Sequence, residues 1–210
     1  MKSQRTSTPA DDKLLAATRE AVVVHGVRRT TANDIAERAG ISRMTFYRRM
    51  GSVDNAVLAA LTEEFRRYAG VADHPAAGHP ASGTARRQLV HFAVESVRVF
   101  ATSELIASIA ERDPEFLIPY VTDRFGASQQ IVLDRLQALL DAGAADGSIE
   151  ASAGTATTVL LAVQGVALSS RVLLKSGSFE ATVAELGKML DRFLTPSGAT
   201  ADGAARAGGE

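Results

Sequence analysis

Apolar residues recur along this chain at intervals of three and four positions, the spacing that places them on one side of an α-helix. The first such set lies between residues 11 and 26, and Asp11 or Asp12 can cap that helix. A second helix is expected from Thr31, with Asp34 completing a variant of the capping box, and it ends at Gly40. The first forty residues therefore predict two helices.

A third helix follows at once in the stretch GISRMTFYRRMGS (residues 40–52). Ser42 is its N-cap, and Ile41 and Phe46 have the spacing of a hydrophobic staple, which fixes the angle at which the chain enters the helix. Two short helices joined by a turn that contains Gly40 make a helix-turn-helix. A fourth helix is expected after Ser52, and its apolar side is formed by Val57, Leu61, Phe65 and Tyr68.

The remaining apolar patterns are also helical. They cover residues 86–102, 104–113, 115–143 (with Pro119 and Gly126 as candidate breaks), 154–174 and 181–194. No segment shows the alternation of a strand, so the predicted fold class is all-α. Five parts are expected: a disordered arm at 1–10, the helix-turn-helix domain with its linking helix at 11–70, a loop at 71–85, a second helical domain at 86–195, and a disordered tail at 196–210.

Composition excludes several classes of protein. The 210 residues contain no cysteine, which removes disulfides, thiolate metal sites and cysteine nucleophiles. The first residues lack the apolar core of a signal peptide, and the most apolar run, at 159–168, is too short to span a bilayer. His74 and His79 share one loop without a third ligand of the right type, and no spacing marks a nucleophile. We expect a cytoplasmic protein with no membrane partner, metal, cofactor or enzymatic activity.

The small net charge of −1 hides an asymmetry. Residues 1–55 hold ten Lys and Arg against six Asp and Glu, a net charge of +4. Residues 56–210 hold thirteen against eighteen, a net charge of −5. A basic N-terminal quarter on an acidic body indicates that this end of the chain meets a polyanion.

The third helix has the side chains that such a partner requires. If Phe46 points inward, a step of 100° per residue places Met50 beside it. The outward and flanking positions are then Arg43, Met44, Thr45, Tyr47, Arg48 and Arg49. Cations, hydroxyls and one thioether on an exposed helix suit the major groove of DNA. The alternative is a surface helix with a solvated charged face, but the caps, the glycine turn, the staple and the local charge all favour DNA binding.

The stretch TTANDIAERAGISRMTFYRRMGSVDNAVLAAL resembles the DNA-binding domain of the TetR family of transcriptional regulators. That family's usual run is close to T-x-x-x-I-A-x-x-A-G-V-S-x-G-T-L-Y-x-H-F-x-S-K, and the match covers roughly residues 11–70. The shared positions are Thr31, Ile35, Ala36, Ala39, Gly40, Ser42, Thr45, Tyr47 and Ser52. The resemblance implies a homodimer of nine-helix subunits, in which four helices bind double-stranded operator DNA and five form a ligand-sensing and dimerising body.

Carried over position by position, the resemblance implies DNA contacts at Thr31, Asn33, Ser42, Arg43, Met44, Thr45, Tyr47 and Arg49, and the helical wheel adds Arg48. Arg43 and Asn33 can make bidentate contacts to guanine and adenine, whereas the hydroxyls suit phosphate oxygens. Three residues depart from the family's pattern. Met44 replaces a glycine, Arg49 replaces a common histidine, and Val53 replaces a phosphate-binding lysine.

The body is expected to dimerise and to bind a small-molecule effector. The helix at 154–174 is apolar nearly all round, which is typical of a helix buried on more than one side. The expected dimer interface comprises Leu161, Gly165, Leu168, Val172, Val183, Leu186, Leu190 and Phe193. The expected effector pocket comprises His91, Glu95, Arg98, Phe100, Leu105, Ile109, Phe116, Tyr120, Gln164 and Leu168.

The function predicted from the sequence is that of a ligand-responsive, homodimeric DNA-binding regulator, most simply a repressor on a palindromic operator. Two alternatives remain open. One is a regulator that dimerises without any ligand, and its body would have no cavity. The other is an all-α carrier or enzyme with an incidental basic N-terminus, which would show no salt-dependent binding to DNA.

Overall fold

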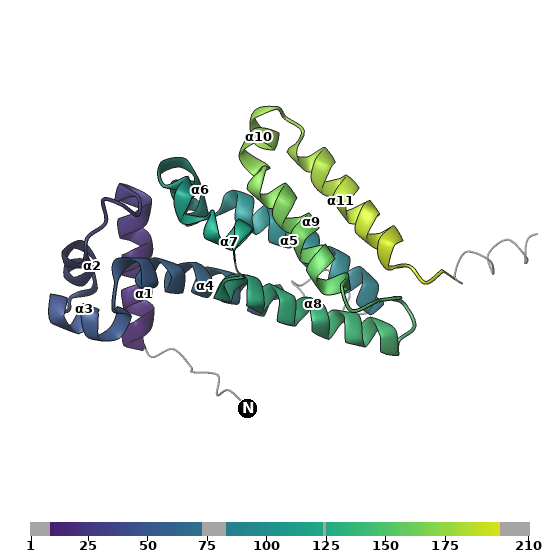
Figure 1. Cartoon of the computed structure of the whole chain (residues 1–210), viewed down its shortest axis with the longest axis horizontal. Coiled ribbons are helices and arrows are strands. Elements are labelled where there is room, and N and C mark those ends of the chain that lie inside the picture. Colours follow the sequence, from purple (N-terminus) through teal and green to yellow (C-terminus); the bar gives the residue numbers. More distant parts are fainter. Residues whose placement is uncertain (1–8, 73–82, 124, 198–210) are drawn as a thin grey trace, which may run out of the picture. The chain divides into compact units, whose positions relative to one another are not determined.

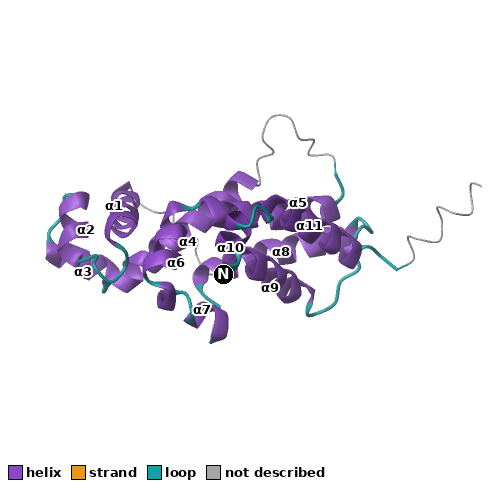
Figure 2. Ribbon diagram, turned by 90° about the horizontal axis from the view of Figure 1, so that it is seen from above, coloured by secondary structure: helices purple, strands orange, loops and turns teal. Residues whose placement is uncertain are grey.

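The computed structural model describes residues 9–72, 83–123 and 125–197. Every element among these residues is a helix, as the sequence predicts (Figure 2). The chain divides into two compact units. The first unit comprises residues 1–67 and 102–128, and the second comprises 68–101 and 129–210. The predicted arm and tail and most of the predicted loop at 71–85 lie outside the described residues.

The first unit begins with α1 (Pro9–His25), α2 (Ala32–Ala39) and α3 (Arg43–Met50), followed by α4 (Val53–Ala72) (Figure 1). Its buried cluster is drawn from all four helices: Leu14, Ala17, Ala21, Ala32, Ile35, Ala36, Ala39, Phe46 and Ala56. Most members are alanines, so the helix backbones approach one another closely around a few larger side chains. The predicted first four helices are confirmed.

A segment far along the chain completes the first unit. It contains α6 (Glu104–Arg112), the short 3-10 helix η1 (Pro114–Phe116) and α7 (Pro119–Thr122). The predicted helix at 115–143 is thus divided at both candidate breaks, because Pro119 starts a new turn and Gly126 precedes α8 (Ala127–Ala145). The compact units consequently do not follow the predicted boundary near residues 71–85, because residues 102–128 group with the N-terminal helices.

The second unit is a bundle of α5 (Ala85–Thr102), α8, α9 (Thr155–Leu168) and α11 (Phe179–Leu194), with the short α10 (Ser170–Lys175) between the last two (Figures 1 and 2). The unbroken helix predicted at 154–174 is wrong: α9 ends at Leu168, and Ser169 separates it from α10, which begins at Ser170. α11 starts two residues before the predicted position.

Gly143 lies at a very close approach between α8 and the residues that follow it. A Cβ built on this residue would lie 2.2 Å from Cδ1 and 2.8 Å from Cβ of Ile149, a buried residue that follows α8. Because the β-carbon of Ile149 cannot rotate away, a larger residue at position 143 forces the backbone to move. Glycine inside a helix is normally unfavourable, but here the close approach requires it.

We therefore expect Gly143→Ala to lower the free energy of unfolding by about 1–3 kcal/mol, despite alanine's better helix propensity. The matched control is Gly154→Ala, because a Cβ at Gly154 meets nothing within 4 Å. That variant should change the free energy by no more than about 1 kcal/mol. Urea unfolding followed by circular dichroism measures both, and equal stability of the two variants would contradict the assignment.

Candidate nucleic-acid interface

Reciprocal hydrogen bonds set the start of α2. The backbone amide of Asp34 donates to the Thr31 hydroxyl at 3.2 Å, and the Thr31 amide donates to the Asp34 carboxylate at 3.0 Å. The Thr31 hydroxyl also donates to this carboxylate, at 2.6 Å. These bonds lower the pKa of Asp34, so the stabilisation is present at neutral pH and is lost as the pH falls through that lowered pKa. The capping box predicted from the sequence is confirmed.

The turn between α2 and α3 is equally well defined. Gly40 adopts φ 68°, in the left-handed region, and the amide of Ile41 donates to the carbonyl of Ala36 at 2.9 Å. The Ser42 hydroxyl then accepts from the Thr45 amide at 3.1 Å and so caps α3. Ile41 packs against the cluster that contains Phe46, as the predicted staple requires.

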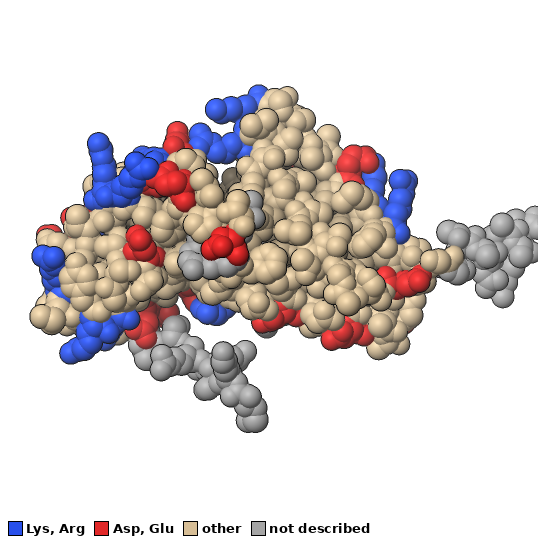
Figure 3. Space-filling model, in the orientation of Figure 1, with Lys and Arg blue, Asp and Glu red and all other residues tan. Residues whose placement is uncertain are grey.

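One side of α3 packs against the rest of the first unit, and the other side is exposed to solvent. Phe46 is completely buried and Met50 is half-buried, whereas Met44 is 77% exposed. Arg43, Tyr47, Arg48 and Arg49 are also exposed, and Thr45 is half-buried. Lys and Arg side chains project around the end of the first unit that carries α2 and α3 (Figure 3). The helical wheel drawn from Phe46 therefore orients this helix correctly.

Arg43 and Tyr47 form a pair on the exposed face. The guanidinium carbon of Arg43 lies 5.5 Å from the centre of the Tyr47 ring, a cation–π distance, and Nη2 lies 3.5 Å from the phenol oxygen. The Tyr47 ring in turn meets the buried Phe46 edge-on, with ring centres 5.5 Å apart. The outward guanidinium therefore packs on a tyrosine that itself contacts the buried Phe46.

Several of the expected DNA contacts already have partners within the protein, and the hydroxyls of Ser42 and Thr45, for example, lie 2.9 Å apart. Arg49 Nη1 lies 3.6 Å from a carboxylate oxygen of Asp11 in the first turn of α1. The single hydroxyl proton of Thr31 is donated to Asp34, so a contact from Thr31 to a phosphate requires that bond to be exchanged. Sequence reasoning missed Asp11 as a competing acid, because residues 38 positions apart on different helices share no local pattern. Val53, where the family's pattern has lysine, packs against the N-terminal cluster.

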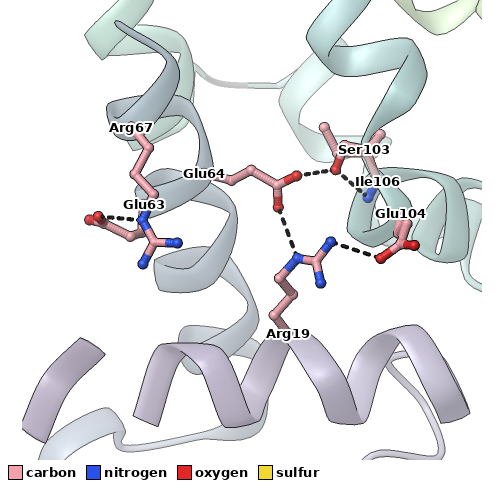
Figure 4. A network of polar contacts seen from close by, with 7 residues as sticks. All are labelled: Arg19, Glu63, Glu64, Arg67, Ser103, Glu104 and Ile106. Atoms are coloured by element: carbon pink, nitrogen blue, oxygen red, sulfur yellow. Dashed lines mark hydrogen bonds and ion pairs between the residues drawn. The ribbon is translucent and has the colours of Figure 1, made fainter. Parts of the chain in front are cut away.

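A network of polar contacts joins α1, α4 and α6 inside the first unit (Figure 4). Arg19 lies 3.9 Å from Glu64 and donates to Glu104 at 3.0 Å. Ser103 donates to Glu64 and caps α6 by accepting from the amide of Ile106. An open pocket of about 430 Å³ lies between α1 and α4, and Arg19 and Glu64 of this network are among the residues that line it. Three helices of the first unit are therefore fixed to one another by charge as well as by packing.

The residues predicted for an effector pocket fall in both units. His91 and Leu168 are exposed, Phe100 and Phe116 are half-buried, and Leu105 and Ile109 are fully buried in the first unit. The polar members have partners of their own. Arg98 binds Glu95 and Glu180, and Gln164 accepts from Gln129 at 2.7 Å. The side chain of Tyr120 lies outside the described residues.

The residues predicted for a dimer interface separate into two groups. Leu161, Gly165, Leu168, Val172 and Phe193 are exposed. Val183, Leu186 and Leu190 are at most 5% exposed, so they pack inside their own unit. These three occupy the side of α11 that faces its own unit, and periodicity cannot distinguish that side from one that faces a partner. Met189 and Leu174, which were not predicted, add to the exposed apolar surface.

The described residues contain no group of three or more His, Asp or Glu side chains that can hold a metal ion. No helix in these described ranges is both long and apolar enough to cross a membrane.

Comparison with known proteins identifies relatives that match most of the chain. The family model described as bacterial regulatory proteins of the tetR family matches residues 14–54. An HTH-type transcriptional regulator of Mycobacterium tuberculosis (strain ATCC 25618 / H37Rv) is 31% identical over 184 residues, which are 87% of this chain and 93% of that protein. A protein of Mycobacterium bovis matches equally well, at 31% over 184 residues, again 87% of this chain and 93% of that protein.

Solved structures share the fold at lower identity. A TetR transcriptional regulator from Streptomyces coelicolor is 24% identical with a TM-score of 0.53, covering 89% of this chain and 99% of that one. FadR from Bacillus subtilis, solved with stearoyl-CoA, is 12% identical with a TM-score of 0.62, covering 87% and 98%. The all-helical fold, the capped helix-turn-helix and the 31% identical relative together show that this chain belongs to the TetR family of DNA-binding transcriptional regulators.

Proposed function

We propose that this regulator is a repressor that binds a palindromic operator as a homodimer and releases it when a small molecule binds. The observation that carries the DNA-binding part is the exposed face of α3, where Arg43 is held over Tyr47 and Met44 is almost fully exposed. A fixed guanidinium loses little conformational freedom on binding DNA, which favours specific contact over loose attraction.

The exposed side chains divide into those that contact base edges and those that bind the DNA backbone. Arg43 reads a guanine edge, Asn33 reads an adenine, and Met44 contacts a thymine methyl group. Thr31, Ser42, Thr45 and Tyr47 bind phosphate oxygens, and Arg48 and Arg49 supply charge. The carboxylate of Asp11 lies 3.6 Å from Arg49, and its negative charge offsets part of the attraction between Arg49 and DNA.

The dimer rests on exposed apolar side chains that three helices of the second unit share. Leu161, Leu168, Val172, Leu174, Met189 and Phe193 are 40–69% exposed. A surface of this kind is unfavourable in water unless something covers it, and a second copy of the same chain is the simplest partner. Gly165 is exposed within this surface, and a Cβ there would meet nothing within 4 Å, so a partner helix can approach closely. A twofold dimer requires a palindromic operator with half-sites about one helical turn apart.

Two observations support effector binding: the mainly apolar interior of the second unit and a structural neighbour. FadR of Bacillus subtilis has the same fold and was solved with stearoyl-CoA. An effector that carries such an acyl chain would act by binding the DNA-free conformation better than the DNA-bound one. A regulator that dimerises without any effector is the second candidate.

Arg43→Ala should weaken binding to the selected operator by about 1–3 kcal/mol and relax the preference for one base pair in each half-site, because a bidentate guanine contact is lost. The operator is first selected from random DNA, and the affinities are then measured by fluorescence anisotropy at one fixed salt concentration. The matched control is Arg38→Ala, which removes an exposed arginine from α2 that pairs with Glu20. Equal losses for the two variants would show that only net charge matters.

Phe193→Glu and Val172→Glu should each convert the dimer to a monomer, because a carboxylate would be buried in the apolar interface. Light scattering at micromolar concentration measures the mass. Ile118→Glu is the control, since Ile118 is 53% exposed in the first unit and outside the proposed interface. A monomeric wild-type protein, or a dimer in both interface variants, contradicts the proposal.

A panel of fatty acids and acyl-CoA thioesters should include a compound that raises the melting temperature and also lowers operator affinity by about 1–3 kcal/mol. Thermal shift followed by operator anisotropy with each hit measures the two effects. Phe100→Trp, a bulky change at a half-buried position, should reduce both effects if the compound binds there. If no compound does both, the regulator without an effector is the better description.

A further inference from the structure

Among the residues that the structure describes, Asp113 is the only charged residue that is buried, and it is 3% exposed. It directly follows α6 and terminates that helix. Burying a carboxylate is costly unless hydrogen bonds replace its lost hydration, so its partners indicate what it does. The residues assigned to DNA contact or dimerisation do not include it.

The partners of Asp113 belong to the turn between α1 and α2. One carboxylate oxygen accepts from the amide of Val27 at 2.6 Å, and the other accepts from the amide of Arg28 at 3.4 Å. The Arg28 side chain adds an ion pair at 3.6 Å. Gly26, with φ 78°, lies against the same carboxylate, because a Cβ there would be 2.7 Å from Oδ2. The turn is therefore folded around the Asp113 carboxylate.

Two further side chains of α6 bind the adjoining end of α1. The Ser108 hydroxyl donates to the carbonyl of Val22 at 2.9 Å, and Arg112 donates to the carbonyl of Val24 at 2.5 Å. The carbonyl of Val22 also accepts from the amide of Gly26 at 2.8 Å, so Ser108 adds a second bond there. Val24 lies in the last turn of α1, where carbonyls lack partners within the helix, and Arg112 supplies a donor to it. One end of α6 thus binds both the last turn of α1 and the loop that follows it.

That loop leads directly to the DNA-binding helices. Thr30 closes it, because its hydroxyl donates to the carbonyl of Gly26 at 2.6 Å and its amide donates to the carbonyl of Val27 at 3.2 Å. The next residue, Thr31, is the N-cap of α2. The position of Val27 and Arg28 therefore sets where α2 begins.

We infer that Asp113 is a positioning residue for DNA binding, which holds the α1–α2 turn so that the N-terminus of α2 presents Thr31 and Asn33 to the operator. This inference rests on the proposed function. The competing explanation is that Asp113 only stabilises the fold. The two explanations predict different operator affinities for a variant that lacks the carboxylate and remains folded.

The test is Asp113→Asn, which keeps the size of the side chain but replaces one accepting oxygen with an NH₂ group that cannot accept from an amide. At a temperature where circular dichroism shows both proteins folded, we expect the variant to bind the selected operator about tenfold more weakly, a change equivalent to about 1.4 kcal/mol. Glu115→Gln is the matched control, because Glu115 also pairs with Arg28 but is exposed. It should bind within about twofold of wild type.

A double-mutant cycle with Asn33→Ala separates positioning from stability. If Asp113 acts through the placement of α2, the loss caused by Asn33→Ala becomes smaller in the Asp113→Asn background. Hydrogen exchange at the amides of Val27 and Arg28 should also become faster. Should Asp113→Asn fail to fold, Arg112→Met, which has no N–H to donate, removes the exposed contact to Val24 and is expected to weaken operator binding in the same direction.

Wild-type operator affinity in folded Asp113→Asn, or in folded Arg112→Met where that variant replaces it, would overturn the inference and leave the proposed function intact. Strict additivity with Asn33→Ala would also overturn it, by showing that Asp113 does not act through α2. A wild-type protein that binds no DNA would overturn the proposed function itself.

Discussion

The DNA-binding surface depends on the burial of one aromatic ring. α3 has eight residues, and an isolated helix of that length is not stable in water. Phe46, which is completely buried against α1 and α2, is the largest apolar anchor that α3 contributes to the N-terminal cluster. The ring also contacts Tyr47, and Tyr47 carries Arg43 above its face. The orientation of the outermost guanidinium is thus set from the core.

The local parts of this arrangement could be predicted from sequence because each is encoded within a few residues. The capping box needs Thr31 and Asp34, and the turn needs Gly40, the one residue type that adopts a positive φ without strain. The inward direction of α3 follows from Phe46 and the helical period. In each case neighbouring residues determine the geometry, so tertiary packing confirms the prediction and does not override it.

The parts that could not be predicted depend on contacts between distant residues. Asp11 opposes Arg49 across 38 positions, and no periodicity relates them. The apolar pattern of α11 was recognised, but Val183 and Leu190 face their own unit and Phe193 faces solvent. An amphipathic pattern shows that a helix has an apolar side, and only the folded chain shows which neighbour covers that side.

The same limit explains why residues 102–128 were assigned to the body of the protein. Their pattern is that of ordinary short helices, and nothing in it points to α1. Yet Ser108, Arg112 and Asp113 supply donors and acceptors to the end of α1, about 85 residues earlier in the chain. A helix C-terminus followed by a glycine turn leaves both carbonyls and amides without partners. Because these groups must be satisfied wherever water is excluded, the turn before the DNA-binding helices needs a second segment to complete it, and the end of α6 is that segment.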